Sequence, residues 1–255
     1  MPPHDTEGTP LPGTLPRFTS EERLDDGVLA REFTLGDIPG TLWTPESAAP
    51  LPLILMAHNN GMSKNEPRLV ARARLSAAYG YAVASIDAAG CGDRPRSAAE
   101  EQARADLRRA MRAGEPVDGI FESFIGPLIE KAAPDWLATL DALLALPEIG
   151  GPVGYSGWTA LGIRLAVADP RIRAAGCFAG GYVPRAQREE ARRVTVPLLL
   201  LLQWDDEGNP RQRALDLFDA FGSTEKTLHA NMGGHTGTPW FEREDGDRFF
   251  GRHLK

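Results

Sequence analysis

Apolar residues in this chain gather in short runs, and the segments between the runs carry apolar positions at helical spacing. Several runs, such as 51–57, 81–86 and 196–202, have almost no polar interruption, which is typical of strands buried on both faces of a sheet. The predicted strands are 28–35, 41–44, 51–57, 81–86, 152–155, 174–178, 196–202 and 226–230, and the predicted helices are 68–79, 158–168, 211–221 and 241–254. This alternation predicts an α/β fold with a mainly parallel sheet and helices on both faces, and the turn after residue 35 adds an antiparallel hairpin at one edge.

Two segments lie outside this alternation of strands and helices. Residues 1–26 begin with a stretch rich in Pro, Gly and Thr, and we assign them to an N-terminal arm ahead of one domain over 27–255. Residues 97–133 hold two helix-like pieces, 98–112 and 120–131, which exceed what one strand–helix unit needs. We expect a small helical insertion there, either as a cap over the strand ends or as surface packing.

Composition and charge narrow the partners of the protein. The chain has 255 residues, a formal net charge of −7 and 42% apolar residues, so we expect no nucleic-acid partner. No apolar run reaches the roughly 20 residues of a membrane span, and the first residues lack the apolar core of a signal peptide. Cys91 and Cys177 do not make a disulfide framework. These features predict a cytoplasmic protein without a membrane partner.

The serine at position 156 stands in the most informative setting of the chain. An apolar run ends in Gly154-Tyr155-Ser156-Gly157-Trp158, and helical spacing begins directly after the serine. A serine on a tight strand-to-helix turn exposes its hydroxyl above the sheet edge and aims the next amide, here that of Gly157, at the same space. The pattern usually ends in a glycine, and Trp158 takes that place here. We therefore interpret Ser156 as a candidate nucleophile.

A serine nucleophile requires a base and an acid that orients the base. His235 follows the last predicted strand in a glycine-rich loop, which makes it the candidate base. Asp205 and Asp206 follow the strand at 196–202, and either is a candidate for the acid. All of these residues come at the ends of predicted strands, where ligands collect in open α/β sheets.

The remaining parts of an acyl-transfer site are donors for the oxyanion and a substrate pocket. The loop after 51–57 carries Asn59 and Asn60, and asparagine tolerates the left-handed backbone that such loops use, so an amide there is the expected second donor. Four aromatic residues are candidates for lining the pocket: Trp158, Trp204, Phe121 and Phe124. The sequence has no metal-ligand spacing, dinucleotide fingerprint or phosphate-binding loop, so we expect no metal and no cofactor.

On these motifs the chain resembles the α/β-hydrolase superfamily, and within it the bacterial serine hydrolases related to dienelactone hydrolase. The resemblance covers roughly residues 40–254 and is carried by five segments: 53–61, 86–93, 154–157, 204–207 and 233–235. It implies the α/β-hydrolase fold and the chain order Ser156, Asp206, His235 for a catalytic triad.

Two spacings refine what the resemblance implies. The acid of this family usually stands four residues before a proline, which favours Asp206 over Asp205 because of Pro210. The spacing from Ser156 to Pro170 is similar to that of the family's elbow helix and argues against Thr159 as the nucleophile.

Residues and resemblance together predict a serine hydrolase that cleaves a carboxylic ester or lactone through an acyl-enzyme, with a small-molecule ester, lactone or thioester as substrate. Two alternatives stay open. One is a biosynthetic cyclase, lyase or acyltransferase on the same scaffold, which Trp158 in place of the elbow glycine favours. The other is a non-catalytic ligand-binding protein of the same fold.

Overall fold

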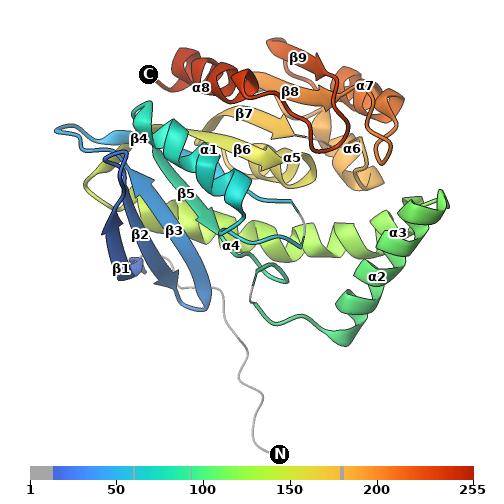
Figure 1. Cartoon of the computed structure of the whole chain (residues 1–255), viewed down its shortest axis with the longest axis horizontal. Coiled ribbons are helices and arrows are strands. Elements are labelled where there is room, and N and C mark those ends of the chain that lie inside the picture. The colour runs from blue at the N-terminus through green and yellow to red at the C-terminus, as the bar shows by residue number, and fades with distance from the viewer. Residues whose placement is uncertain (1–13, 60, 93, 179–180) are drawn as a thin grey trace, which may run out of the picture.

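A single sheet organises the chain. The computed structural model describes residues 14–59, 61–92, 94–178 and 181–255. Within these residues nine strands form one sheet of order β1-β2-β3-β5-β4-β6-β7-β8-β9 (Figure 1). The strands are β1 (Arg17–Arg23), β2 (Leu29–Leu35), β3 (Ile38–Thr44), β4 (Leu51–Met56), β5 (Ala82–Ile86), β6 (Ile149–Trp158), β7 (Ile172–Phe178), β8 (Leu198–Gln203) and β9 (Lys226–Asn231). Strands β2 and β3 form the predicted antiparallel hairpin, to which β1 adds antiparallel at the edge, and β4 to β9 run parallel to one another, as the apolar runs predict.

Helices cover both faces of the sheet (Figure 1). They are α1 (Pro67–Ala78), α2 (Ala98–Ala113), α3 (Asp118–Ile120), the π-helical turn η1 (Phe121–Ile125), α4 (Gly126–Leu144), α5 (Thr159–Ala168), α6 (Arg185–Ala191), α7 (Arg211–Ala220) and α8 (Phe241–Leu254). Helices α1 and α8 share a hydrophobic core with one face of the sheet, and α4 and α5 share a core with the other. No helix in the described part of the chain is both long and apolar enough to cross a membrane.

The central strands send alternate side chains into the two cores. In β4, Leu53 and Leu55 pack on the side of α4 and α5, whereas Ile54 and Met56 pack on the side of α1 and α8. The same alternation in β6 directs Gly154 and Ser156 toward α1 and α8. Added Cβ atoms at Gly154 and Gly176 would lie 2.9 and 3.3 Å from the Phe250 ring, so the missing side chains let α8 approach the sheet closely.

Several elements differ from the prediction; helix α6 was not predicted at all, and β1, α4 and β6 differ in assignment or extent. Strand β1 lies within the segment assigned to the arm, and it pairs with β2 although six of its seven residues are exposed. Helix α4 continues to Leu144, past the predicted end and through Pro134. Strand β6 extends two residues beyond Ser156, because Trp158 still pairs with Phe178 on β7, and α5 therefore begins at Thr159.

Candidate active site

A cavity of about 660 Å³ lies beside the ends of the central parallel strands. Its lining combines the loop after β4, the end of β6, the loop after β9, and residues of α1 and α8. Ser156, Gly157 and His235 all line it, so the candidate nucleophile and the candidate base share one space. Asp206 lies behind His235, in hydrogen-bond contact with it.

Ser156 is presented by a buried strand. Its backbone lies between Met56 on β4 and Gly176 on β7, its carbonyl accepts a hydrogen bond of 2.8 Å from the Ala57 amide, and the residue is 2% exposed. The next residue is Gly157, with φ 144°, where an added Cβ would lie 2.2 Å from the Ala57 carbonyl oxygen. A glycine is therefore required for β6 to pass the loop after β4 at this distance.

Thr159 provides a second hydroxyl close to this junction. It is fully buried, its Oγ1 donates to the Phe178 carbonyl oxygen at 3.2 Å, and it is not part of the cavity lining. A hydroxyl in that position cannot meet a substrate in the cavity, whereas Ser156 can. This placement favours Ser156 over Thr159, in agreement with the spacing to Pro170.

One aspartate contacts the His235 ring, and a second contacts the backbone of the loop that carries it. The Nδ1–H of His235 donates to Asp206 Oδ2 at 2.7 Å, and the Asp206 side chain is only 2% exposed while that of His235 is 48% exposed. Asp206 also accepts from the Gly208 amide at 2.8 Å. Asp205 instead accepts the amides of Gly233 and Gly234, each at 2.9 Å, and these bonds lower the pKa of its carboxyl. Asp206 thus orients the imidazole, and Asp205 fixes the loop that carries it.

The loop after β4 reaches the cavity with its first residues. Asn59 lines the cavity beside His58, and its carbonyl accepts the Met62 amide at 3.1 Å. The ring of His58 lies between the carbonyl oxygens of Asn59 and Ile86, so this histidine shapes the turn. Asn60, the other candidate for the oxyanion amide, lies outside the described residues.

The four aromatic candidates do not come together at the cavity. Trp158 packs partly buried against the core under α4 and α5, and Phe124 is buried in a cluster with α4. Phe121 stacks on Tyr182 with ring centres 5.1 Å apart, and the exposed Trp204 lies under the Arg211 guanidinium. None of the four is among the residues that line this cavity, so their role in substrate binding stays a prediction.

The helical insertion contacts α6 and α7 and does not line this cavity. Asp118 at its centre is bound by Arg213 of α7 at 2.6 Å, and Glu122 accepts the Arg185 amide at 2.6 Å. These contacts tie α3 and η1 to the two helices that follow β7 and β8. No described residue between 97 and 133 lines the cavity, and a capping role remains a prediction.

Among the charged residues of the cavity that were not found from the sequence, Arg72 is partly buried and Asp247 is buried. Arg72 on α1 donates from Nη2 to Ser156 Oγ at 2.6 Å, and its guanidinium lies 4.1 Å from the centre of the Phe178 ring. Asp247 on α8 accepts from Ser76 at 2.5 Å, and burial raises the pKa of its carboxyl to about 6. A signal was present for Arg72, because it lies within the stripe of α1 formed by Leu69, Ala73 and Ser76, where an amphipathic helix normally has no charge.

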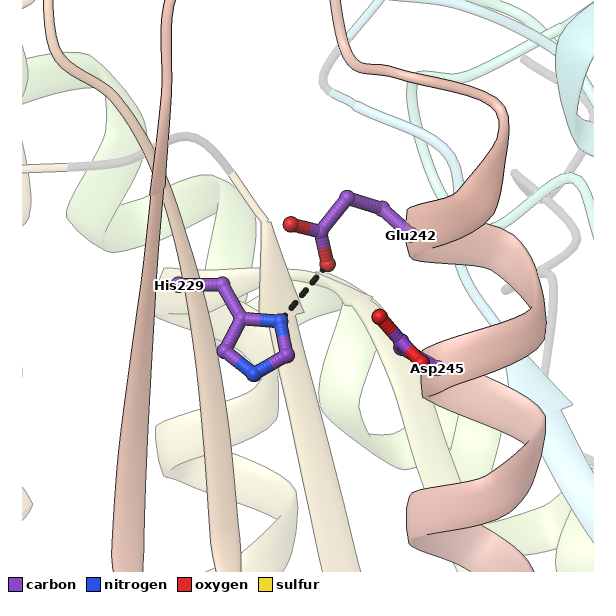
Figure 2. A group of neighbouring side chains, drawn as sticks. All are labelled: His229, Glu242 and Asp245. Atoms are coloured by element: carbon purple, nitrogen blue, oxygen red, sulfur yellow. Dashed lines mark hydrogen bonds and ion pairs between the residues drawn. The ribbon is translucent and has the colours of Figure 1, made fainter.

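A cluster of potential metal ligands joins β9 to α8. His229, Glu242 and Asp245 offer ligand atoms within 4.8 Å of one another, and Figure 2 shows the Glu242 carboxylate directed at the His229 ring. These groups already have partners, since Glu242 accepts from His229 and Asn231 at 2.7 Å each and Asp245 pairs with Arg248. We assign the cluster a structural task, which is to hold the buried Glu242 at the cavity wall.

Comparison with solved structures identifies the architecture. A cold-adapted esterase from an Arctic intertidal metagenomic library, in complex with PEG, is 27% identical with a TM-score of 0.75, over 92% of this chain and 98% of that chain. An acetyl xylan esterase from Paenibacillus sp. R4 is 17% identical with a TM-score of 0.67, over 94% of this chain and 88% of that one. A dienelactone hydrolase from Anabaena variabilis is 18% identical with a TM-score of 0.61, over 94% and 99%.

Sequence comparison adds no nearer relative: no protein-family model matches the chain, and no curated protein matches it. The sheet order, the parallel strands with helices on both faces and the full-length similarity to these solved structures point to one architecture. The chain therefore has the α/β-hydrolase fold.

Proposed function

We propose that this protein is a serine hydrolase that cleaves a carboxylic ester or a lactone, with Ser156 as nucleophile, His235 as base and Asp206 as the acid that orients the base. The observation that carries the proposal is the shared cavity: Ser156 lines it, and so does a histidine whose Nδ1–H is bound to a buried carboxylate. The esterases among the similar structures support this reaction class.

The tautomer of His235 fits the role of a base. Because Nδ1 carries the proton that Asp206 accepts, Nε2 is the nitrogen that can take the Ser156 proton. As that proton leaves, Ser156 Oγ attacks the carbonyl carbon, and the amides of Gly157 and of Asn59 or Asn60 stabilise the oxyanion. His235 then donates the proton to the leaving alcohol, and a water molecule activated by the same histidine hydrolyses the acyl-enzyme.

In the free protein the Ser156 hydroxyl is hydrogen-bonded to a residue other than the proposed base. The hydrogen bond that Ser156 Oγ makes within the described residues is with Arg72, not with His235. A hydroxyl oxygen can accept one hydrogen bond and donate another, so the bond to Arg72 leaves the proton of Ser156 free for His235. Catalytic hydrogen bonds are often long in a free enzyme and shorten when substrate binds.

The test of the proposal is the Ser156→Ala variant together with a fluorophosphonate probe, which reacts with activated serines. We expect the probe to label the wild-type protein at Ser156 and the variant to lose turnover of short esters by about 10³-fold or more, with an unchanged melting temperature. Wild-type protein that the probe leaves unlabelled, or a variant with normal turnover, would remove Ser156 from the mechanism. Hydrolysis in ¹⁸O-labelled water separates net hydrolysis from acyl transfer, because only hydrolysis places the label in the acid product.

A further inference from the structure

The Arg72 guanidinium is the charged group closest to the nucleophile in this structure. We propose that Arg72 is a positioning residue that holds Ser156 Oγ through one of its lone pairs and stabilises the negative charge that forms on this oxygen as its proton passes to His235. The proposal rests on the proposed function, since it takes Ser156 as the nucleophile. It adds a component that a Ser–His–Asp triad and an oxyanion hole do not include.

Three elements fix the position of the guanidinium. Helix α1 begins at a cap in which the Glu66 side chain accepts the Leu69 amide at 2.9 Å, which sets the helix against the sheet. The guanidinium then stacks on Phe178 of β7, 4.1 Å from the ring centre, and Nη2 reaches Ser156 of the neighbouring strand β6 at 2.6 Å. A planar group held by a ring and a hydrogen bond has little freedom to move away from Oγ.

The charge balance of Arg72 is unusual for an arginine that is largely shielded from solvent. Burial lowers the pKa of its guanidinium to about 10, so the group is still a cation at neutral pH. Among the described residues, no carboxylate forms an ion pair with it; Asp247 and Glu66 attract its charge without direct contact. Arg94, by contrast, is bound by Asp135 and by Asp37 at 2.5 Å each, which is the arrangement expected of a structural arginine.

A partly buried cation whose hydrogen-bond partner is a neutral hydroxyl gains most when that oxygen becomes negative. The interaction is therefore stronger in the transition state for proton transfer than in the resting enzyme, which is the condition for an effect on rate. The cation is already in place before substrate binds, so little reorganisation is required at the moment of reaction. Loss of a charge-assisted hydrogen bond of this kind corresponds to about 10- to 100-fold in rate.

The experiment compares Arg72→Met and Arg72→Lys with Arg74→Met as matched control. Arg74 lies on the same helix but pairs with Asp25 and Asp26 at the surface. The readouts are kcat and KM for a short p-nitrophenyl ester, the rate of fluorophosphonate labelling of Ser156, and the melting temperature. We expect Arg72→Met to lose about 10- to 100-fold in kcat and in labelling rate with a similar KM, Arg72→Lys to lose less because the charge remains, and Arg74→Met to behave as wild type.

Chemical rescue keeps the proposal testable if a variant is unstable. In Arg72→Ala, methylguanidinium added below denaturing concentrations should restore part of the labelling rate, because the vacated position borders the cavity. A structural role alone would not produce such rescue. Labelling of the Arg72 variants at the wild-type rate or faster overturns the proposal while leaving Ser156 as nucleophile. Wild-type protein that is not labelled at all instead overturns the proposed function.

Discussion

The two sides of Ser156 are built in different ways. On the side of α1 and α8 the neighbours are buried or partly buried and are fixed by packing, as the stacking of Arg72 on Phe178 shows. On the other side His235 belongs to a glycine-rich loop, is 48% exposed, and is fixed by carboxylates rather than by a core. The proposed nucleophile is thus placed by the fold, and the proposed base by local hydrogen bonds. Changes on the packed side should therefore affect stability as well as activity, whereas changes on the loop side should affect activity alone.

The largest effect is expected on the loop side, for Asp206→Asn. Asparagine has one side-chain oxygen where aspartate has two. If that oxygen accepts the Gly208 amide, the asparagine NH₂ group faces His235 Nδ1, and the imidazole takes the wrong tautomer for a base. We expect kcat to fall by about 10³- to 10⁴-fold with little change in melting temperature. Steady-state kinetics and thermal unfolding check this. Asp205→Asn is the control, with a much smaller loss because it weakens only the loop contact; the reverse ranking would shift the acid to Asp205.

On the packed side, Gly157→Ala should lower stability first and activity as a result. The new Cβ would lie 2.2 Å from the Ala57 carbonyl oxygen, at a backbone φ of 144° that L side chains rarely adopt. We expect a loss of about 3 kcal/mol or more in unfolding free energy, measured by urea titration. Gly151→Ala is the control, because Gly151 also has a positive φ of 84° but has no atom within 4 Å of an added Cβ. Equal losses in both variants would show that the contact with Ala57 is unimportant.

On the packed side, Asp247→Asn should have a smaller effect on the unfolding free energy, and this effect should depend on pH. Burial raises the pKa of Asp247 from 3.8 to about 6. The folded protein binds the proton of the Asp247 carboxyl more tightly than the unfolded chain does. The contribution of this protonation to stability is therefore complete below about pH 4 and is lost as the pH rises through about 6. Asparagine does not ionise, so the variant should match wild type near pH 4 and exceed it by up to about 3 kcal/mol near pH 8.

Urea titrations at the two pH values measure this difference. Asp245→Asn serves as control, since Asp245 makes a surface ion pair with Arg248 and its loss should give no gain at high pH. A difference between Asp247→Asn and wild type that does not change with pH would contradict the assigned cause.

The sequence was sufficient for the parts of this molecule that repeat a strong local pattern. Buried strands such as β4 and β8 were predicted within one or two residues, because uninterrupted apolar runs have few other uses. Strand β1 could not be predicted, because its exposed and charged residues carry no burial pattern and its stability comes from pairing with β2. The exact end of β6 was also missed, since it depends on how closely Gly157 approaches Ala57.

The candidate site divides in the same manner. The positions of Ser156 and His235 on one cavity follow from strand ends, which a sequence reveals. The contact of Arg72 with Ser156 links residues 84 positions apart, and only the three-dimensional packing of α1 on β6 and β7 brings them together. The aromatic candidates could not be placed from the sequence, because a large apolar ring near a motif is as easily part of the core as of a pocket, and the four rings do not line this cavity.

The close approach of α8 to Gly154 and Gly176 has a consequence for how the cavity is enclosed. Helix α8 supplies Glu242, Asp247 and Phe250 to the cavity wall, whereas the proposed nucleophile and base come from β6 and from the loop after β9. The enclosure and the proposed reacting groups therefore belong to different elements. A change that loosens α8 from the sheet would admit water to the cavity while leaving Ser156 and His235 on their own supports.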